Sequence, residues 1–485
     1  MRKLSLFSCS CRLRAWPVWL VLTGAIFFSG SALAVEPPAG TTAETAGPDA
    51  RIDVEPVEDL LDLYQRALEN DPQLRAARFE YEAAREAVPQ AVAGLLPDAS
   101  ASMSSIRSRQ KIISSDNQVF ASGSTSFRTR TDTLTITQPL FDWKALVGVF
   151  QARADVRRAT VAFEQARQDL IIRVSDRYLA VLLAEDRLAF ARAELDAVES
   201  DFALAEGRHS MGLAPVTDLL DARARLASVR AAEIEAYNQL DDARQALEEV
   251  CGFLYGKHAR LVRAMPMPGP EPAELESWLA ASRDQNLDII QKRHEVEAAR
   301  QEVRRQRAGH LPTIEAVGSY EREDTGGTLF GGGSDVEARD IGMRVNVPLF
   351  AGGEVRSFTR QAQNLYRAVL MDQERLRREV ERETRAAFLG VQTAISRAEA
   401  LEQSVAAQQL VVEAKQRGFR SGLYTSLAVL DAQRDLYRAL QDHAEARYDY
   451  LLNSLRLKRT IGTLSESDLL MINQWLVPDK SGGQG

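Results

Sequence analysis

The chain has 485 residues, and 60 basic against 68 acidic side chains give it a formal net charge of −8. Its 45% of hydrophobic and 26% of charged residues are typical of a globular protein and argue against a disordered polyelectrolyte, while the acidic excess disfavours a protein that binds nucleic acid. No apolar run reaches the roughly 18 residues that a membrane-spanning helix needs, so strands would have to make any membrane crossing.

The N-terminus has the features of a secretory signal peptide. Four basic side chains precede an apolar run: Arg2, Lys3, Arg12 and Arg14. The run extends from Ala15 to Phe28 and leads to an Ala-Leu-Ala sequence that ends at Ala34. Residues 1–34 are therefore predicted to be a cleaved signal peptide, and residues 35–57 a flexible lead-in. Cleavage leaves Cys251 without a disulfide partner, so we expect it to be a small residue that packs between helices.

The rest of the chain reads as two copies of one unit. Three landmarks recur about 210 residues further on: Leu96-Pro97 as Leu311-Pro312, Pro139-Leu140-Phe141 as Pro348-Leu349-Phe350, and Gly212-Leu213 as Gly422-Leu423. The first repeat is predicted to span residues 58–254 and the second residues 273–465. A Pro-rich linker over 255–272 joins them, and a C-terminal tail over 466–485 follows. Each repeat is predicted to contain a helix, two strands, a long helix, a turn and a further helix.

Strands are predicted at residues 98–113 and 126–139 in the first repeat, and at 312–323 and 338–348 in the second. Several threonines alternate with apolar residues in the first repeat: Thr133, Thr135 and Thr137 with Leu134 and Ile136. In the second repeat the alternation is cleaner: Ile341, Met343, Val345 and Val347 with Asp340, Gly342, Arg344 and Asn346. About ten residues with one apolar and one polar face are typical of a barrel strand in a bilayer.

The long helices carry a heptad pattern. In the first repeat apolar residues recur seven apart: Val174, Val181, Leu188, Leu195 and Phe202. The second repeat has a matching series: Val391, Ala398, Val405 and Val412. A helix from about Trp143 to Glu206 would be roughly 96 Å long, which no compact domain accommodates. We therefore expect an elongated bundle or barrel of helices.

Two strands per repeat give four strands per chain, whereas a spanning barrel needs at least about eight so that no strand edge stays unpaired in lipid. Chains must then pool their strands, with eight from two chains or twelve from three. The alternative is a soluble four-stranded sheet that caps a periplasmic rod of helices. The signal peptide, the strand length and the loop composition favour the spanning interpretation.

At these residues the chain resembles the TolC family of outer-membrane channel proteins. The resemblance covers residues 58–478 and rests on the duplicated order and on paired segments: LLPDASASMS and HLPTIEAVGSY before the strands, ITQPLFDW and VNVPLFAGG after them, and the hairpins GLAPVTDLLDARARL and GLYTSLAVLDAQRDLY. It implies a mainly α fold with membrane β-strands. The duplicated unit would form a homotrimer with an α-helical periplasmic barrel, topped by one shared 12-stranded outer-membrane β-barrel.

The resemblance also implies a function and partners. The trimer would be the outer-membrane exit duct of a tripartite export system. It would receive substrates from an inner-membrane ABC or proton-driven transporter through a periplasmic adaptor (membrane fusion) protein. The ending IGTLSESDLLMINQWL is similar to the subgroup that serves type I protein secretion. The alternative is a multidrug or small-molecule efflux duct, because the pump selects the cargo.

In that picture the hairpin turns near residues 207–217 and 417–426 form the periplasmic entrance. Four turn residues are predicted to contact the adaptor: Gly212, Leu213, Gly422 and Leu423. Glycine permits the turn and leucine offers an exposed apolar side chain. The alternative is a turn glycine followed by a locally packed leucine.

Acidic residues after the turns are implied to line the narrow entrance: Asp218, Asp221 and Asp431. Threefold copies would focus a negative potential that favours cations, although Asp218 also suits the first turn of a helix. The second repeat has Ala428 where the first has Asp218, which puts a second acidic ring at that level in doubt. Three arginines beside the turns would pair with the aspartates and keep the entrance closed, or else be solvated: Arg208, Arg417 and Arg420.

The sequence offers no catalytic constellation, cofactor motif or metal site. The five histidines lack metal-ligand spacing: His209, His258, His294, His310 and His443. Residues 252–257 fall one residue short of a phosphate-binding loop. A protein that is not an enzyme is therefore predicted. The remaining alternative to a channel is a non-conducting periplasmic coiled-coil adaptor or structural protein.

Overall fold

A computed structural model describes residues 57–111, 113–114, 124–254, 257–262, 265–327 and 332–477. They all belong to one unit of the chain, Glu55–Gly485. The signal peptide predicted over 1–34 and nearly all of the lead-in predicted over 35–57 lie outside the described residues. Val57, placed at the end of that lead-in, instead begins a short strand.

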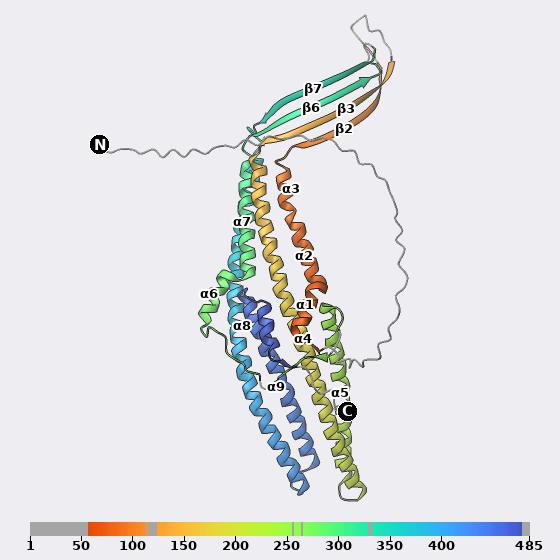
Figure 1. The fold of residues 1–485 in the computed structure, drawn as a ribbon, viewed down its shortest axis with the longest axis vertical. Helices are drawn as coiled ribbons and strands as arrows, with labels where there is room; N and C mark the ends of the chain where they lie inside the picture. Colours follow the sequence, from red (N-terminus) through yellow and green to blue (C-terminus); the bar gives the residue numbers. More distant parts are fainter. Residues whose placement is uncertain are drawn as a thin grey trace, which may run out of the picture. The chain divides into compact units, whose positions relative to one another are not determined.

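The described elements follow the duplicated order (Figure 1). The first repeat contains β1 (Val57–Glu58), α1 (Leu60–Asn70), α2 (Pro72–Arg85), α3 (Ala87–Ala93), β2 (Asp98–Lys111), β3 (Ser124–Phe141), α4 (Trp143–Ser210) and α5 (Val216–Cys251). The second contains α6 (Leu275–Gln285), α7 (Leu287–Ala308), β6 (Thr313–Thr325), β7 (Ser334–Asn346), α8 (Glu354–Arg420) and α9 (Ser426–Thr460). The linker contributes β4 (Lys257–His258) and β5 (Arg260–Leu261), and the tail contributes α10 (Glu466–Asn473) and β8 (Leu476–Val477).

The helical segment before β2 is broken, although the residue pattern predicts one helix over 72–95. Asp71 caps α2 by accepting a hydrogen bond from the Leu74 N–H at 2.7 Å, and Pro72 stands at its first position. The helix ends at Arg85 because Pro89 has no N–H to donate to the Arg85 carbonyl and its ring crowds that carbonyl. The chain resumes as α3 and then enters the sheet.

The four long strands form one antiparallel sheet in the order β2-β3-β6-β7, so the two repeats meet at β3 and β6 (Figure 1). Within the described residues, β2 and β7 each have a strand neighbour on one side only. β7 ends at Asn346, short of the predicted 338–348, because Pro348 cannot donate a ladder hydrogen bond. β3 runs past the predicted 126–139 to Phe141, through an irregularity at Pro139.

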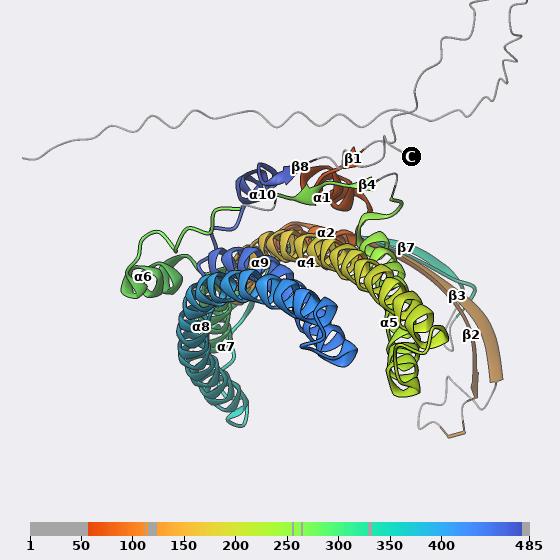
Figure 2. The ribbon, with the colours of Figure 1, turned by 90° about the horizontal axis from the view of Figure 1, so that it is seen from below.

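Two antiparallel helical hairpins make up the other end of this unit, one from α4 and α5 and one from α8 and α9. Helix α4 has 68 residues, which at a rise of 1.5 Å per residue is about 102 Å. α2, α3 and α5 all pack along α4, with α2 and α3 on the part of α4 nearer the sheet (Figure 1). α7 packs against both α4 and α8. Figure 2, seen along the helices, shows α8, α9, α4 and α5 in a curved row with α1, α6 and α10 on one side of it.

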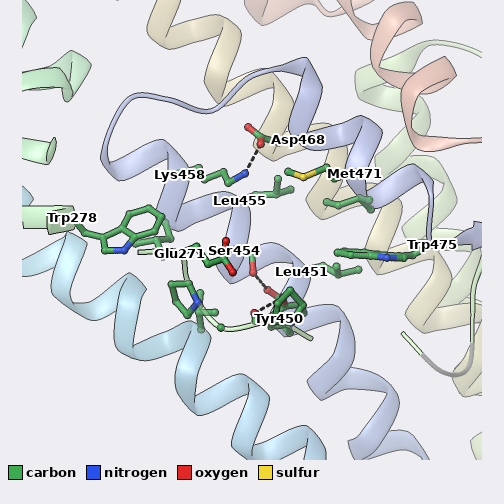
Figure 3. A pocket seen from close by; sticks show the side chains of 16 residues that line it. Glu271, Trp278, Tyr450, Leu451, Ser454, Leu455, Lys458, Asp468, Met471 and Trp475 are labelled. Atoms are coloured by element: carbon green, nitrogen blue, oxygen red, sulfur yellow. Dashed lines mark hydrogen bonds and ion pairs between the residues drawn. The ribbon is translucent and has the colours of Figure 1, made fainter. Parts of the chain in front are cut away.

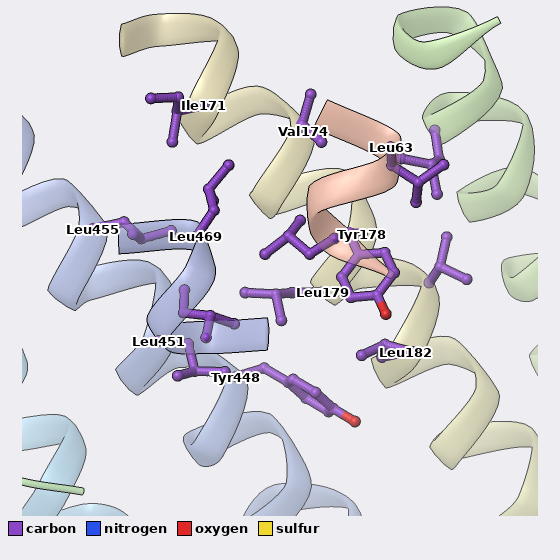
Figure 4. Packing of buried hydrophobic residues seen from close by; sticks show 14 of the residues in the cluster. Leu63, Ile171, Val174, Tyr178, Leu179, Leu182, Tyr448, Leu451, Leu455 and Leu469 are labelled. Carbon is purple, nitrogen blue, oxygen red and sulfur yellow. The ribbon is translucent and has the colours of Figure 1, made fainter. Parts of the chain in front are cut away.

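The main hydrophobic core lies midway along the long helices, where α1 and α10 pack on α4 and α9. Five of its side chains are at most 1% exposed: Leu63, Tyr178, Leu182, Leu451 and Leu469 (Figure 4). Burying a leucine side chain stabilises a fold by about 1.5–3 kcal/mol. This central belt of buried side chains therefore holds together the long helices, whose ends bury much less apolar surface.

The predicted linker over 255–272 and tail over 466–485 are not simply a connector and a free end. β4 pairs with β1, and β5 pairs with β8, so both segments fold back onto the middle of the helices. Lys458 Nζ lies 2.5 Å from Asp468 Oδ1 of α10, whose Leu469 is in the core. These elements have two to eight residues, too few for a periodic pattern to predict them.

A cavity of about 410 Å³ opens between α9, α10 and residues 268–271 (Figure 3). Trp278 and Trp475 face it from opposite sides. The Tyr450 hydroxyl donates to the Pro268 carbonyl at 2.9 Å and ties the linker to α9. Nearby in the core, Cys251 is fully buried and burial raises the pKa of its thiol to about 12, as expected of a packing residue.

Candidate functional site

The candidate site is the end of the two hairpins farthest from the sheet. In the first hairpin φ of Gly212 is +73°. The Leu213 N–H donates to the Arg208 carbonyl at 2.8 Å, and the Gly212 N–H donates to the His209 carbonyl at 2.9 Å. These two bonds make a Schellman motif, which needs a residue in the left-handed region and therefore favours glycine. The turn ends α4 abruptly and reverses the chain into α5.

The second hairpin repeats this geometry. φ of Gly422 is +79°, the Leu423 N–H donates to the Gly418 carbonyl at 2.8 Å, and the Gly422 N–H donates to the Phe419 carbonyl at 3.1 Å. Leu213 and Leu423, which follow the two glycines, are 65% and 79% exposed in the single chain. Neither leucine is packed locally, so both remain free to contact another molecule.

The two turns differ in how they pack. A Cβ atom on Gly418 would overlap the ring of Tyr424, so the second hairpin needs glycine there. At the equivalent positions the first hairpin has Arg208 and Ala214. The first hairpin has the large residue first and the small one second, whereas the second hairpin has them in the opposite order. With alanine in place of the tyrosine, the side chain of Arg208 is free to point away from its own turn.

Arg208 reaches the second hairpin, where its guanidinium carbon lies 5.1 Å from the centroid of the Phe419 ring. A cation over an aromatic face at this distance is attracted by the ring quadrupole. The contact connects the tips of α4 and α8. Arg208 thus contacts the second hairpin through an aromatic partner and not through one of the predicted aspartates.

Within the described part of the chain, the other two predicted arginines differ: Arg417 has an acidic partner, whereas Arg420 forms no ion pair. Arg417 pairs with Glu413 of the same helix at 2.7 Å. Among the described residues of one chain, none of the three arginines forms an ion pair with Asp218, Asp221 or Asp431. The predicted closing pairs are therefore not formed within a single chain.

The three aspartates occupy different surroundings. Asp218 is half-buried in the first turn of α5, in a small hollow between the hairpins that Arg208 and Phe419 also line. Asp221 is exposed one turn later. Asp431 pairs with Arg434 at 3.2 Å, a partner that sequence reasoning missed. At Ala428, the position equivalent to Asp218, the backbone N–H is capped by the Thr425 hydroxyl at 3.3 Å.

Sequence reasoning also missed a polar contact that joins the hairpins. Asp201 of α4 lies against Gln433 of α9, and the buried atoms Asp201 Oδ2 and Gln433 Oε1 have no hydrogen-bond partner among the described residues. Burial raises the pKa of Asp201, and the hydrogen bond from Gln433 opposes this only in part. The only sequence signal for this contact is that the polar residue Asp201 stands next to the heptad position Phe202.

Apolar contacts also join the two hairpins near Asp201 and Gln433. Val198 of α4, Leu226 and Val229 of α5, and Leu430 of α9 form a small separate core. The Tyr437 hydroxyl of α9 donates to the Ala193 carbonyl of α4 at 3.0 Å. The two hairpins are therefore held together by a few contacts, far fewer than in the central belt.

At the opposite end of this unit the sheet has two chemically distinct faces. The register places Ile136, Gly318 and Ile341 in one row, and Thr135, Ser319 and Asp340 in the next row on the other face. We call these the apolar face and the polar face. Ile341 and Met343 on the apolar face are 97% and 68% exposed. The alternation predicted for residues 340–347 follows this register as far as Asn346, where β7 ends.

The described helices include none that is long and apolar enough to cross a membrane. Nor do the described residues contain a group of three or more His, Cys, Asp or Glu side chains that could hold a metal ion.

Comparison with protein families matches two segments of the chain, residues 63–252 and 278–463, to the outer membrane efflux protein family. The two matched segments correspond to the two repeats. The outer membrane protein TolC of Vibrio cholerae is 32% identical over 421 residues, which cover 86% of this chain and 94% of that protein. The proteases secretion protein PrtF of Dickeya chrysanthemi is 30% identical and covers 86% of this chain and 90% of its own length.

Among solved structures, the Campylobacter jejuni CmeC outer membrane channel superposes with a TM-score of 0.73 at 16% identity, over 87% of this chain and 90% of that one. The fold is that of outer-membrane channels, and the relatives and the family place the protein in the outer membrane, extending into the periplasm. The chain belongs to the outer membrane efflux protein family.

Proposed function

We propose that this protein is the outer-membrane exit duct of a tripartite export system, and that it works as a homotrimer. The observation that carries this proposal is the sheet, which has one apolar and one polar face and two edges that no strand among the described residues covers. Exposed edges are not tolerated in lipid. Three chains, joined β7 to β2, supply twelve strands and close the sheet with its polar face inward.

The hairpin end supports the second half of the proposal. Leu213 and Leu423 offer two exposed apolar contacts per chain to the tip of a periplasmic adaptor that is linked to an inner-membrane transporter. Asp218 and Asp221 follow the first of these turns and, in three copies, give the entrance a negative potential. A duct with this entrance selects little itself, because the transporter chooses the cargo.

We favour protein secretion of type I over small-molecule efflux. A protease secretion protein is similar to this chain at 30% identity along almost all of both chains. Deleting the gene in its host is expected to remove specific proteins from the culture supernatant and to leave tolerance of drugs unchanged. The opposite pattern would favour the efflux alternative.

Planar bilayer recordings test the duct itself. Purified full-length protein should run as a detergent-stable trimer and give discrete single-channel steps. Absence of steps, or a stable state other than a trimer, would contradict the proposal and favour a non-conducting periplasmic protein.

The same recordings test the acidic entrance. Asp218→Asn combined with Asp221→Asn removes six carboxylates per trimer and should reduce cation selectivity, seen as a reversal potential closer to zero in a salt gradient. The control is Asp196→Asn, because Asp196 is an exposed residue of α4. Unchanged reversal potentials in the double variant would refute the lining role of these two residues.

A further inference from the structure

A cluster of basic side chains lies on the apolar face of the sheet, at the end away from the helices. Three are on β2 and two on β3: Arg107, Arg109, Lys111, Arg128 and Arg130. All five are exposed, and the register places them on the same face as Met103 and Leu134. Arg107 lies four residues beyond Met103, about 13 Å along the strand. We call these five residues the basic collar.

The collar has little internal compensation. Arg107 lies directly opposite Arg128, and like charges at such positions destabilise a strand pair. Arg128 Nε donates to the Ser105 hydroxyl at 2.7 Å, a neutral partner, and within the described part of the chain Arg130 alone of the five pairs with an acid, Asp132 at 3.1 Å. Among the described residues of a single chain, Arg107 and Arg109 form no ion pair.

The neighbouring strands show that this imbalance is local. On the same face of β6 and β7, Arg322 pairs with Asp335 at 2.6 Å and Arg339 pairs with Glu337 at 3.6 Å, and Asp324 lies directly opposite Arg130. Arg130 thus lies between Asp132 and Asp324, whereas Arg107 and Arg128 face each other and form no ion pair among the described residues. An external anion with more than one charge would relieve the repulsion.

The position of the collar identifies the source of that anion. Below Ser105 and Asp132, the side chains of β2 and β3 on the same face are apolar, and they face lipid if the sheet spans the outer membrane, as in the proposed function on which this inference rests. The collar then stands at the height of the outer-leaflet headgroups. Arginine binds phosphate through paired hydrogen bonds, and basic clusters at a membrane surface bind phosphorylated lipids.

We propose that Arg107, Arg109 and Arg128 form a docking surface for the phosphorylated headgroup of an outer-leaflet glycolipid. The lipid phosphates bridge the two facing arginines and fix the trimer at one depth and rotation in the membrane.

Native mass spectrometry of the full-length trimer in detergent tests this docking. The probes are bisphosphorylated lipid A, the same lipid without phosphates, and inorganic pyrophosphate. Arg107→Gln with Arg109→Gln should weaken lipid A binding about thirtyfold, because each arginine at a lipid surface contributes about fivefold. Arg107→Lys with Arg109→Lys should retain much of the binding. Arg344→Gln, on the polar face of the same sheet, should retain all of it.

Three results would overturn the inference: no binding of lipid A by the unaltered trimer, equal binding by the double glutamine variant, or equal binding of the lipid without phosphates. Pyrophosphate bound as tightly as lipid A would overturn the assignment to a lipid. Single-channel recordings of the same samples in bilayers without lipid A separate the two proposals. If channels form but lipid A does not bind, only the proposed docking surface is contradicted. If no channels form, the proposed function is contradicted.

Discussion

Arg208 and Phe419 form the one direct link between the tips of α4 and α8 that involves a charge among the described residues. The link is possible because the first hairpin has Ala214 where the second has Tyr424, so its own turn leaves Arg208 free. A cation over an aromatic ring at an exposed site contributes about 0.5–1 kcal/mol, which is small enough for a transporter-bound adaptor to overcome. In the proposed duct, this contact would suit a closure of the entrance that has to open for export.

Replacing Arg208 by alanine should loosen the contact between the hairpins by about 0.5–1 kcal/mol and raise the fraction of time that single channels are open. Phe419→Ala should have a similar effect. The control is Arg417→Ala, which removes a charge of the same sign that pairs only within α8. An equal effect in the control would mean that charge near the entrance matters and the ring contact does not.

Asp201 gives the hairpin contact a pH dependence. Burial raises the pKa of its carboxyl, so the folded protein holds that proton more tightly than the unfolded chain does. The ionised carboxylate consequently costs stability, fully above the raised pKa and not at all below the ordinary one. Asp201→Asn should raise the melting temperature at pH 7.5, and the advantage should vanish as the pH falls through that window. The exposed Asp196→Asn is the control, and a gain independent of pH would contradict this account.

At the scale of elements, each hairpin depends on one glycine in the left-handed region. Nothing lies within 4 Å of a Cβ atom added to Gly212 or Gly422, so substitution strains only the backbone. The leucines that follow are exposed and carry little of the stability. The turn geometry and the adaptor contact can therefore be perturbed separately.

Gly212→Ala and Gly422→Ala should each destabilise the local hairpin by about 1 kcal/mol, seen as faster amide exchange around the turn. Leu213→Asn with Leu423→Asn should leave exchange and conductance unchanged but reduce the amount of adaptor that copurifies. Faster exchange in the leucine variant would show that these side chains pack, against the exposure described above.

Much of this arrangement could be predicted from the sequence, because heptads, strand alternation and Gly-Leu turns each repeat about 210 residues apart. The resemblance to the TolC family and the fold it implies are confirmed by the family match and the solved channels. The break at Glu86, the folded tail and the partners of Arg208 were beyond these patterns. The break depends on a single proline, the folded tail on segments of at most eight residues, and the Arg208 contact on packing between the repeats. None of these leaves a periodic signal in the sequence.

At the scale of the whole molecule, adjacent residues of β7 face opposite environments. Ile341 lies on the apolar face and Asp340 on the polar face, although one peptide bond separates them. If the sheet closes in a membrane, the two positions must respond differently to the same substitution.

Ile341→Arg should cost up to about 2–4 kcal/mol per chain and reduce the amount of trimer in the outer-membrane fraction, because the charge would enter lipid. Asp340→Arg should assemble normally and shift ion selectivity toward anions. The measurements are heat-modifiable trimer on gels and reversal potentials. Equal assembly of both variants would contradict the membrane orientation of the sheet.

The burial of Cys251 has a practical consequence for spectroscopy. Its thiol lies inside the central belt with a pKa raised to about 12, so labelling reagents that attack the thiolate at neutral pH find almost none. If the predicted signal peptide is cleaved, no other cysteine is present. Single cysteines placed at Leu213 or Leu423 can then carry fluorophores or spin labels in the unmodified background, and the distances between the three copies can report directly how far the entrance opens.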